Sequence, residues 1–242
     1  MPWYFAVIED GLDIQNPTSR AKIELLGEHL GLTNGSHVLD VASGRGGPAL
    51  ILAGTFGCRI TGIEKAEEFD AVARRRVRDE ELEGLVELIQ ADARQYPLAQ
   101  DRYDAAICLG ASFIWEGLEG TIEALKPAVR SMGLIVVGEP YWRIWPLPEG
   151  HAWSDEGYLP LDATIERFRT AELEPVSVID ASLDDWDRYE SRRWQAADRW
   201  LRSHPDDPDA ESIRSRSARD RDEYFRWRRD QLGWAIIAAR KP

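Results

Sequence analysis

The sequence predicts an α/β protein with a doubly wound, mostly parallel seven-stranded sheet and a helical cap from the C-terminal third. Strand-like apolar runs alternate with helix-like segments over the first two-thirds of the 242 residues, as in parallel sheets with helical crossovers. Two of these runs, 58–64 and 103–109, are apolar along most of their length, which is typical of a sheet covered on both faces. Amphipathic helical segments follow over 183–230.

The expected elements follow the chain in order. The seven strands are expected at 37–42, 58–64, 85–90, 103–109, 134–138, 175–180 and 234–239. Helices are expected at 16–30, 48–56, 67–82, 118–129, 161–171, 183–201 and 209–230. The first helix is expected to begin with Asn16 as N-cap and Pro17 at its first position. Residues 141–160, rich in Pro, Trp and Gly, are expected to form a long loop that serves as a lid.

Composition excludes several classes of partner. The net charge of −13 argues against nucleic acid and against an anionic membrane surface, because both would be repelled. The two cysteines, Cys58 and Cys108, lie in apolar runs, which indicates a reduced compartment and therefore the cytoplasm. The N-terminus lacks the pattern of a signal peptide, and no apolar run is long enough to span a bilayer. Because no Cys/His cluster has ligand spacing, no metal site is expected.

A glycine-rich turn follows the first strand and indicates a nucleotide-like ligand. Glycine lets backbone approach a ligand closely, and such a turn directs free N–H groups at it. The run from Gly44 to Ala49 fits the dinucleotide pattern G-x-G-x-x-G/A, and Glu64 lies twenty residues beyond Gly44. Taken alone, this pattern indicates NAD and an oxidoreductase.

Acidic residues at successive strand ends favour a different ligand. Ligands of such sheets bind outside the carboxyl ends of the strands. Asp40 would repel a pyrophosphate but attract a cationic amine and a sulfonium. Glu64 is suited to accept both ribose hydroxyls, and Asp92 to accept the exocyclic amine of adenine. Together the three carboxylates favour S-adenosylmethionine over NAD.

The same segments resemble class I S-adenosylmethionine-dependent methyltransferases. The resemblance rests on V-L-D-V-A-S-G-R-G at 38–46, on Glu64, on Ala91-Asp92-Ala93 and on 103–110, and it spans about 16–139 plus the terminal strand. Segments 14–17, 110–112, 138–143, 186–190 and 232–234 are similar to the bacterial YjhP-like group. Ala42 stands where the usual pattern has its first glycine, and no Asn/Asp-Pro-Pro-Tyr/Phe run follows the fourth strand.

The resemblance implies a Rossmann-like methyltransferase fold of EC class 2.1.1, with the last strand antiparallel to the fifth. It implies one domain, 1–242, made of an N-terminal lid and helix (1–36), a cofactor-binding core (37–139) and a substrate cap and lid (140–232). The cofactor-binding residues that it implies are Asp40, Ala42, Ser43, Gly44, Gly46, Glu64, Lys65, Asp92, Ala93, Leu109 and Gly110.

The acceptor is expected to be a small molecule, because the chain is acidic and lacks the motif that grips a planar nitrogen. Direct in-line transfer would methylate an O, N, S or C nucleophile. Glu139 and Tyr141 are the catalytic candidates, with a structural ion pair between Glu139 and Arg143 as the alternative.

Candidate substrate-binding residues are Asn16, Trp115, Trp142 and His151, with Trp145 and Trp153 as further aromatic walls and a surface position as the alternative for His151. The protein is expected to act as a monomer or homodimer. Three other functions stay open: an NAD-dependent oxidoreductase, a cofactor-binding protein without transferase activity, and an enzyme that uses the same cofactor to transfer a different group.

Overall fold

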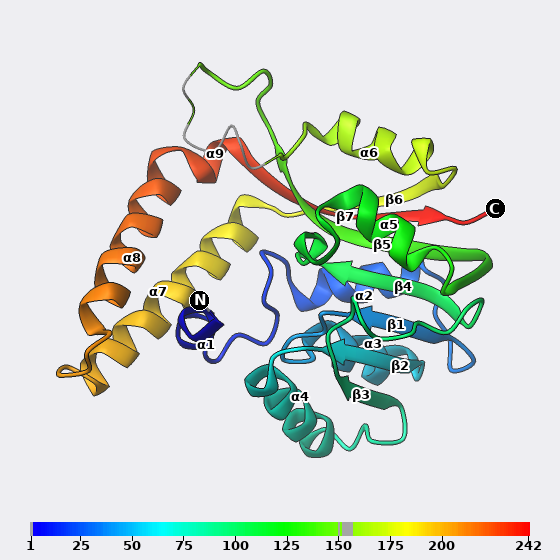
Figure 1. Cartoon of the computed structure of the whole chain (residues 1–242), viewed down its shortest axis with the longest axis horizontal. Coiled ribbons are helices and arrows are strands. Elements are labelled where there is room, and N and C mark those ends of the chain that lie inside the picture. Colours follow the sequence, from blue (N-terminus) through cyan, green and yellow to red (C-terminus); the bar gives the residue numbers. More distant parts are fainter. Residues whose placement is uncertain (1, 150, 152–156) are drawn as a thin grey trace.

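The predicted doubly wound sheet is confirmed. The computed structural model describes residues 2–149, 151 and 157–242, and its seven strands lie in the order β3-β2-β1-β4-β5-β7-β6 (Figure 1). The strands are β1 (His37–Val41), β2 (Arg59–Glu64), β3 (Val86–Gln90), β4 (Tyr103–Leu109), β5 (Val129–Trp142), β6 (Glu174–Asp180) and β7 (Leu232–Arg240). Only β7 runs antiparallel to its neighbours, β5 and β6, as the family resemblance implies.

Helices cover both faces of this sheet. The helices are α1 (Pro2–Ile8), α2 (Arg20–His29), α3 (Gly47–Phe56), α4 (Glu67–Asp79), α5 (Leu118–Leu125), α6 (Leu161–Thr170), α7 (Leu183–Ser203), α8 (Ala210–Glu223) and α9 (Arg229–Gln231). Successive strand residues point to opposite faces. Val38 and Ile107 therefore pack in one apolar cluster with α2, α3 and α4, whereas Leu39 and Cys108 pack in a second cluster with α5 and α6.

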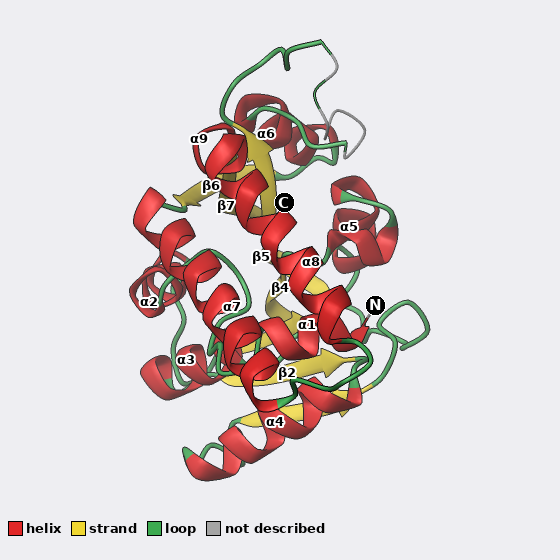
Figure 2. Ribbon diagram, turned by 90° about the vertical axis from the view of Figure 1, so that its left-hand side faces the viewer, coloured by secondary structure: helices red, strands yellow, loops and turns green. Residues whose placement is uncertain are grey.

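The helices α1, α7 and α8 form an arm beyond the carboxyl ends of the parallel strands. In Figure 1, β4 points toward this arm, and Figure 2 shows the three helices in front of the sheet. Tyr4, Ile8, Ala197 and Ile213 form a small apolar cluster that joins them. The arm thus stands over the edge of the sheet where ligands bind in this architecture. No helix in the described part of the chain is long and apolar enough to cross a membrane.

The first predicted helix begins later than expected. Its N-cap is Ser19, whose hydroxyl accepts a hydrogen bond from the Lys22 N–H at 3.3 Å, and the helix runs from Arg20. The predicted cap, Asn16, instead donates its side-chain amide to the Leu109 carbonyl at 3.2 Å. A long-range contact therefore overrides the local capping signal and holds the segment before α2 against the end of β4.

The strand β5 is longer than predicted. It continues through Pro140 to Trp142 and stays paired with β7, whereas β4 makes its last pair between Leu109 and Gly138. Because β4 has ended there, the missing N–H of Pro140 costs no hydrogen bond to that strand. The predicted loop therefore begins only after Trp142, and its residues 150 and 152–156 lie outside the described residues.

Candidate functional site

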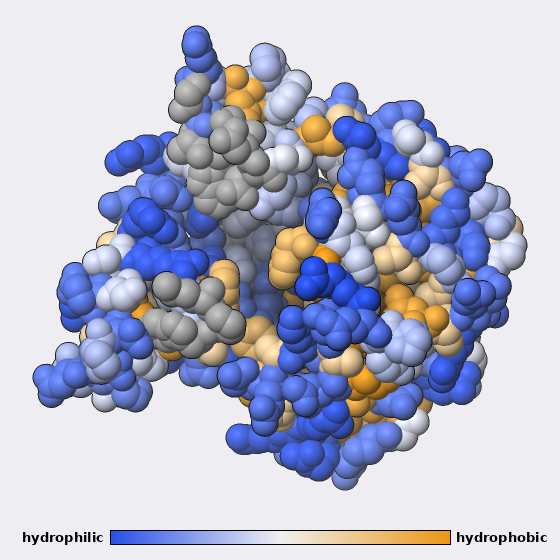
Figure 3. Space-filling view, in the orientation of Figure 1, coloured by the Kyte–Doolittle hydropathy of each residue, from blue (hydrophilic) through white to orange (hydrophobic). Residues whose placement is uncertain are grey.

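A cavity of about 1150 Å³ opens between the carboxyl ends of the strands and the arm, where the surface in Figure 3 is hollowed. One end, here called the strand end, is lined by Asp40, Glu64 and Asp92. The opposite part, here called the α7 end, is lined by residues that include Trp186 and Arg193. A pocket for one small ligand usually measures about 300–1,000 Å³, so this cavity has room for two ligands side by side.

The glycine turn forms the floor of the strand end. Gly44 and Gly46 adopt left-handed φ values of 55° and 78°. Ala42 does so as well, at 56°, in the position where the family usually has glycine. The turn is tied to β2 by the Ser43 N–H, which donates to the Ile63 carbonyl at 3.1 Å. A glycine-rich chain is needed here because side chains with a Cβ rarely adopt these angles.

The segment before α2 rests directly on this turn. A Cβ on Gly44 would lie 2.1 Å from Gln15 Oε1, and one on Gly47 would lie 2.0 Å from the Asp13 carbonyl oxygen. Gln15 Oε1 accepts a hydrogen bond from the Arg45 N–H at 2.7 Å. The N-terminal segment thus covers the turn, and Gln15 lines the cavity, although the resemblance over 14–17 gave this residue no role.

Two carboxylates at neighbouring strand ends keep acceptor capacity for a ligand. Glu64 accepts the Gly44 N–H at 2.9 Å and the Ala66 N–H at 2.7 Å, which uses two of its roughly four lone-pair sites. Asp92 pairs with Lys65 at 2.9 Å, and this hydrogen bond is the main cause that lowers the pKa of Asp92. Both side chains therefore present oxygen acceptors to the strand end of the cavity.

Asp40 is the buried acid at the centre of this end. Its side chain is buried, and its Oδ2 has no hydrogen-bond partner in the part of the chain that the structure describes. Burial, with a smaller contribution from the charge of Glu64, raises the pKa of Asp40 to about 8. The Ser43 hydroxyl is likewise buried and unpartnered among the described residues. Such atoms fit a ligand that brings a cation and a hydrogen-bonding group, as S-adenosylmethionine would.

Glu139 lies on β5, one residue beyond the last pair with β4, and lines the cavity. It is 8% exposed, and its Oε1 has no hydrogen-bond partner among the residues that the structure describes. Burial raises the pKa of Glu139 to about 7, against a hydrogen bond from Ser112 that lowers it. Its alternative partner, Arg143, bonds instead to Asp180 at 3.3 Å. The carboxyl group is thus poised to exchange a proton near neutral pH.

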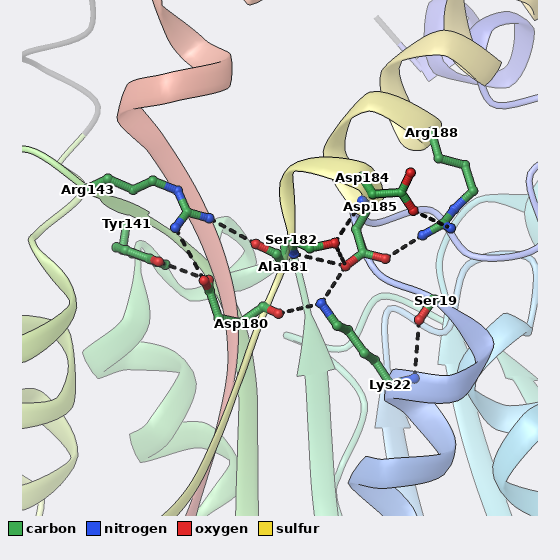
Figure 4. Close-up of polar contacts among 10 residues, drawn as sticks. All are labelled: Ser19, Lys22, Tyr141, Arg143, Asp180, Ala181, Ser182, Asp184, Asp185 and Arg188. Carbon is green, nitrogen blue, oxygen red and sulfur yellow. Dashed lines mark hydrogen bonds and ion pairs between the residues drawn. The ribbon is translucent and has the colours of Figure 1, made fainter.

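Tyr141 faces away from the cavity. Its hydroxyl donates to Asp180 at 2.9 Å, beside the guanidinium of Arg143, as Figure 4 shows. Burial and the hydrogen bond to Asp180 raise the pKa of Tyr141 to about 12. Because Tyr141 does not line the cavity, the structure does not bring it together with Glu139 there.

The remaining candidate residues also divide into those that line the cavity and those that do not. Ten of the eleven candidate cofactor residues line the cavity, and Gly46 does not: the ten are Asp40, Ala42, Ser43, Gly44, Glu64, Lys65, Asp92, Ala93, Leu109 and Gly110. Asn16 also lines it, but Trp115, Trp142 and His151 do not. His151 bonds to Gln231 at 3.1 Å and packs edge-on against the buried Trp142.

Trp145 is exposed at 56%, and Trp153 lies outside the described residues. The sequence reasoning missed a group of residues that line the α7 end, namely Glu9, Tyr158, Trp186, Tyr189, Arg193 and Trp234. The signal that pointed to α7 was the helical spacing of Trp186 and Tyr189, which marked an apolar face but gave no indication that a ligand shares it.

Comparison with known proteins identifies the family. A family model described as a methyltransferase domain matches residues 38–133. YjhP of Escherichia coli K12, a protein described as uncharacterised, is 32% identical over 243 residues, which cover 98% of each chain. A methyltransferase from Thiobacillus denitrificans, solved with S-adenosylhomocysteine, has a TM-score of 0.93 at 34% identity, covering 100% of this chain and 99% of its own.

A second methyltransferase, from Geobacter sulfurreducens and also solved with S-adenosylhomocysteine, has a TM-score of 0.94 at 34% identity, with the same coverage. These likenesses extend over the arm as well as the sheet, because they cover the whole chain. The chain therefore belongs to the class I S-adenosylmethionine-dependent methyltransferases.

Proposed function

We propose that this methyltransferase transfers the methyl group of S-adenosylmethionine to a small-molecule acceptor by direct in-line displacement. The observation that carries the proposal is the single continuous cavity, with cofactor-type acceptors at the strand end and further room at the α7 end. Its volume of about 1150 Å³ suits a cofactor and a small acceptor together.

The strand end would hold the cofactor through groups of complementary charge. Asp40 would hold the cationic part of the methionine moiety, Glu64 the ribose hydroxyls and Asp92 the adenine amine, with Lys65 and Ala93 beside them. The glycine turn offers close backbone approach. The two bacterial relatives solved with S-adenosylhomocysteine support this assignment, since their structures match the whole chain.

The protein would contribute alignment, exclusion of water and one proton acceptor. When bound, S-adenosylmethionine supplies an electrophilic methyl group on a sulfonium that departs as a thioether. The arm would shield the reaction from water, and Glu139 would take the proton from an acceptor nucleophile that arrives protonated. The buried carboxyl with a pKa near 7 suits that exchange.

The other expectations complete the proposal. Residues 1–36 would act as lid and helix, 37–139 as the cofactor-binding core and 140–232 as the substrate cap, with Asn16 among the residues near the acceptor. The enzyme would work in the cytoplasm as a monomer or homodimer. Two buried free thiols, Cys58 and Cys108, are consistent with that compartment.

The test is methyl transfer itself. The protein is incubated with trideuteromethyl S-adenosylmethionine and a bacterial metabolite extract, and the mixture is analysed by mass spectrometry. A small molecule that gains one trideuteromethyl group, with S-adenosylhomocysteine formed in equal amount, is the expected result. Labelling of only nucleic acid or protein would contradict the proposal, and so would an absence of any labelled product.

A further inference from the structure

We infer that the α7 end of the cavity binds the acceptor through an acidic group, a carboxylate or a phosphate, held by the guanidinium of Arg193. The inference rests on the proposed function and names the chemical class of its acceptor. It is carried by the buried guanidinium of Arg193, which lines the cavity and keeps an N–H group without a partner among the described residues.

Two arginines in the cavity wall share one carboxylate. Arg193 on α7 contacts both oxygens of Glu190 at 3.3 and 3.4 Å, and Arg228 contacts the same carboxylate at 2.8 Å. The side chain of Arg193 is 11% exposed and that of Glu190 only 2%. Guanidinium groups stay charged at any physiological pH, and the carboxyl groups whose charges act on Arg193 are Glu190, Glu9 and Asp220.

Glu9 is the other carboxyl group at this end of the cavity. It accepts the side-chain amide of Gln15 at 2.6 Å and the hydroxyl of Tyr189 at 3.4 Å. Burial raises the pKa of Glu9, although Gln15, Arg193 and Tyr189 act in the opposite direction. Because burial disfavours the charged form of Glu9, an acidic group that approaches Arg193 meets less repulsion from this carboxyl group.

Arg193 also has an unused donor in a fixed position. Its Nε is buried and makes no hydrogen bond to any residue that the structure describes. The guanidinium lies 5.2 Å from the centroid of the Tyr189 ring, which limits its rotation. A planar guanidinium with free N–H groups binds a carboxylate or phosphate through two parallel hydrogen bonds.

The wall around the cluster adds two supporting features. Trp186, Trp234 and Leu232 line the same cavity, so the acceptor would carry an apolar or planar body next to its acidic group. Arg228 lies in a π-helix, η3 (Tyr224–Arg228), that interrupts the run from α8 to α9. Such π-helical turns are frequent at functional sites.

The test uses simple probes on the protein saturated with S-adenosylhomocysteine. Benzoate, phenyl phosphate and the neutral analogue benzamide are titrated by calorimetry. We expect at least one anion to bind saturably and roughly tenfold or more tighter than benzamide, since hydrogen bonds to charged groups discriminate by about that factor. The better anion distinguishes a carboxylate acceptor from a phosphate acceptor. Equal affinity for the three probes, or no binding at millimolar concentration, would overturn the inference.

Variants at Arg193 locate the anion. R193M should lose about tenfold to a hundredfold in anion affinity while S-adenosylhomocysteine binds within twofold of wild type. R193K keeps the charge but lacks the planar guanidinium, so its anion affinity should lie between those of wild type and R193M. R193K also provides the test if R193M does not fold. The matched control is R192M, which removes the same charge from the preceding, exposed position of α7.

Two results with these variants would contradict the assignment. Unchanged anion binding in R193M would place the anion elsewhere, and loss of S-adenosylhomocysteine affinity would assign Arg193 to the cofactor. These results differ from those expected if the proposed function itself is wrong. In that case the wild-type protein would bind no S-adenosylhomocysteine or would transfer no methyl group.

Discussion

Two buried carboxyl groups in one cavity illustrate how position decides chemistry at the scale of single residues. Asp40 and Glu139 are both buried, both have an oxygen without a partner among the described residues, and both have raised pKa values. Asp40 lies beside Glu64 at the strand end, where a bound cation would favour its ionised form. Glu139 lines the same cavity on β5, and the proposed function gives it the role of a base.

Asp40 should make both stability and cofactor affinity depend on pH. Its pKa is raised from 3.8 to about 8 in the folded protein, so its stabilising contribution is complete below about pH 4 and is lost as the pH rises through 8. Between about pH 5 and 9 the melting temperature of ligand-free wild type should therefore fall more than that of D40N. Glu139 adds to the fall in both proteins, and exposed Asp206 provides the control variant D206N.

Binding of S-adenosylmethionine should show the opposite trend. Because the cation favours ionised Asp40, the affinity of wild type should rise by up to about tenfold per pH unit below pH 8. D40N should bind weakly with little pH dependence from this group. Calorimetry across the pH range measures both, and a pH dependence that survives unchanged in D40N would contradict the role of Asp40.

Substitution of Glu139 should separate catalysis from cofactor binding. E139Q keeps the shape of the side chain but accepts no proton, so kcat should fall by about 10²–10⁴-fold. The change of kcat/KM with pH near pH 7, which would report the titration of Glu139, should be absent in E139Q. Affinity for S-adenosylhomocysteine should stay within twofold of wild type. E119Q, at an exposed position whose charge also acts on Glu139, is the control; equal rates in E139Q and wild type would exclude the base.

Site residues were predictable where the sequence carries a strand end followed by a turn. Asp40, Glu64 and Asp92 followed from their places after apolar runs, and all three line the cavity. The roles of Gln15 and Arg193 were not predictable, because their approach to the cavity depends on how the segment before α2 and the helix α7 lie over the strand ends. No local pattern records a contact between segments so distant in the sequence.

At the scale of elements, the start of α7 positions the α7 end of the cavity. Ser182 caps the helix: its hydroxyl accepts the Asp185 N–H at 3.1 Å, and the Asp185 carboxylate accepts the Ser182 N–H at 2.9 Å. Lys22 and Arg188 pair with the same carboxylate, as Figure 4 shows. The first turn of α7, which carries Trp186, is thereby fixed against α2.

Loss of this cap should weaken the whole arm slightly. S182A removes the helix-capping acceptor and should lower the free energy of unfolding by about 1 kcal/mol. S191A, in the interior of the same helix, should change it by only a few tenths of a kcal/mol. Urea unfolding followed by circular dichroism measures both variants. An equal effect at the two positions would show that the cap does not stabilise α7.

The helices and strands predicted most accurately are those whose sequence signals are local. The boundaries of β4 were predicted to the residue, since an apolar run sits between polar turns. The length of β5 was underestimated, because a proline such as Pro140 usually indicates the end of a strand. Only the structure shows that β4 has already ended at this point, so the proline does not interrupt the pairing. The helix α1 and the π-helix η3 were missed, since tertiary packing against α7 sets both.

At the scale of the whole molecule, the cavity links ligand binding to stability. The arm, the segment before α2 and the glycine turn all contribute lining residues to it. A ligand that binds only the folded state stabilises it by RT ln(1 + [L]/Kd), which is about 2.7 kcal/mol at a hundredfold excess over Kd.

Thermal unfolding should therefore depend on the ligand. The melting temperature should rise with the concentration of S-adenosylhomocysteine by several degrees at such an excess, and NAD should have no effect. Differential scanning fluorimetry measures the shift, with adenosine as the partial ligand. A shift as large with NAD as with S-adenosylhomocysteine would contradict the account of the strand end.

Calorimetric titration of wild type and E64A with S-adenosylhomocysteine tests the cofactor site most directly. Wild type should bind one equivalent, and E64A should bind at least about tenfold more weakly, because it loses the ribose acceptor and the hydrogen bond that orders the turn at Gly44. E83Q, at an exposed position outside the cavity, should bind like wild type. Affinity in E64A equal to that of wild type would contradict the central claim that the carboxylates at the strand ends hold the methyl donor.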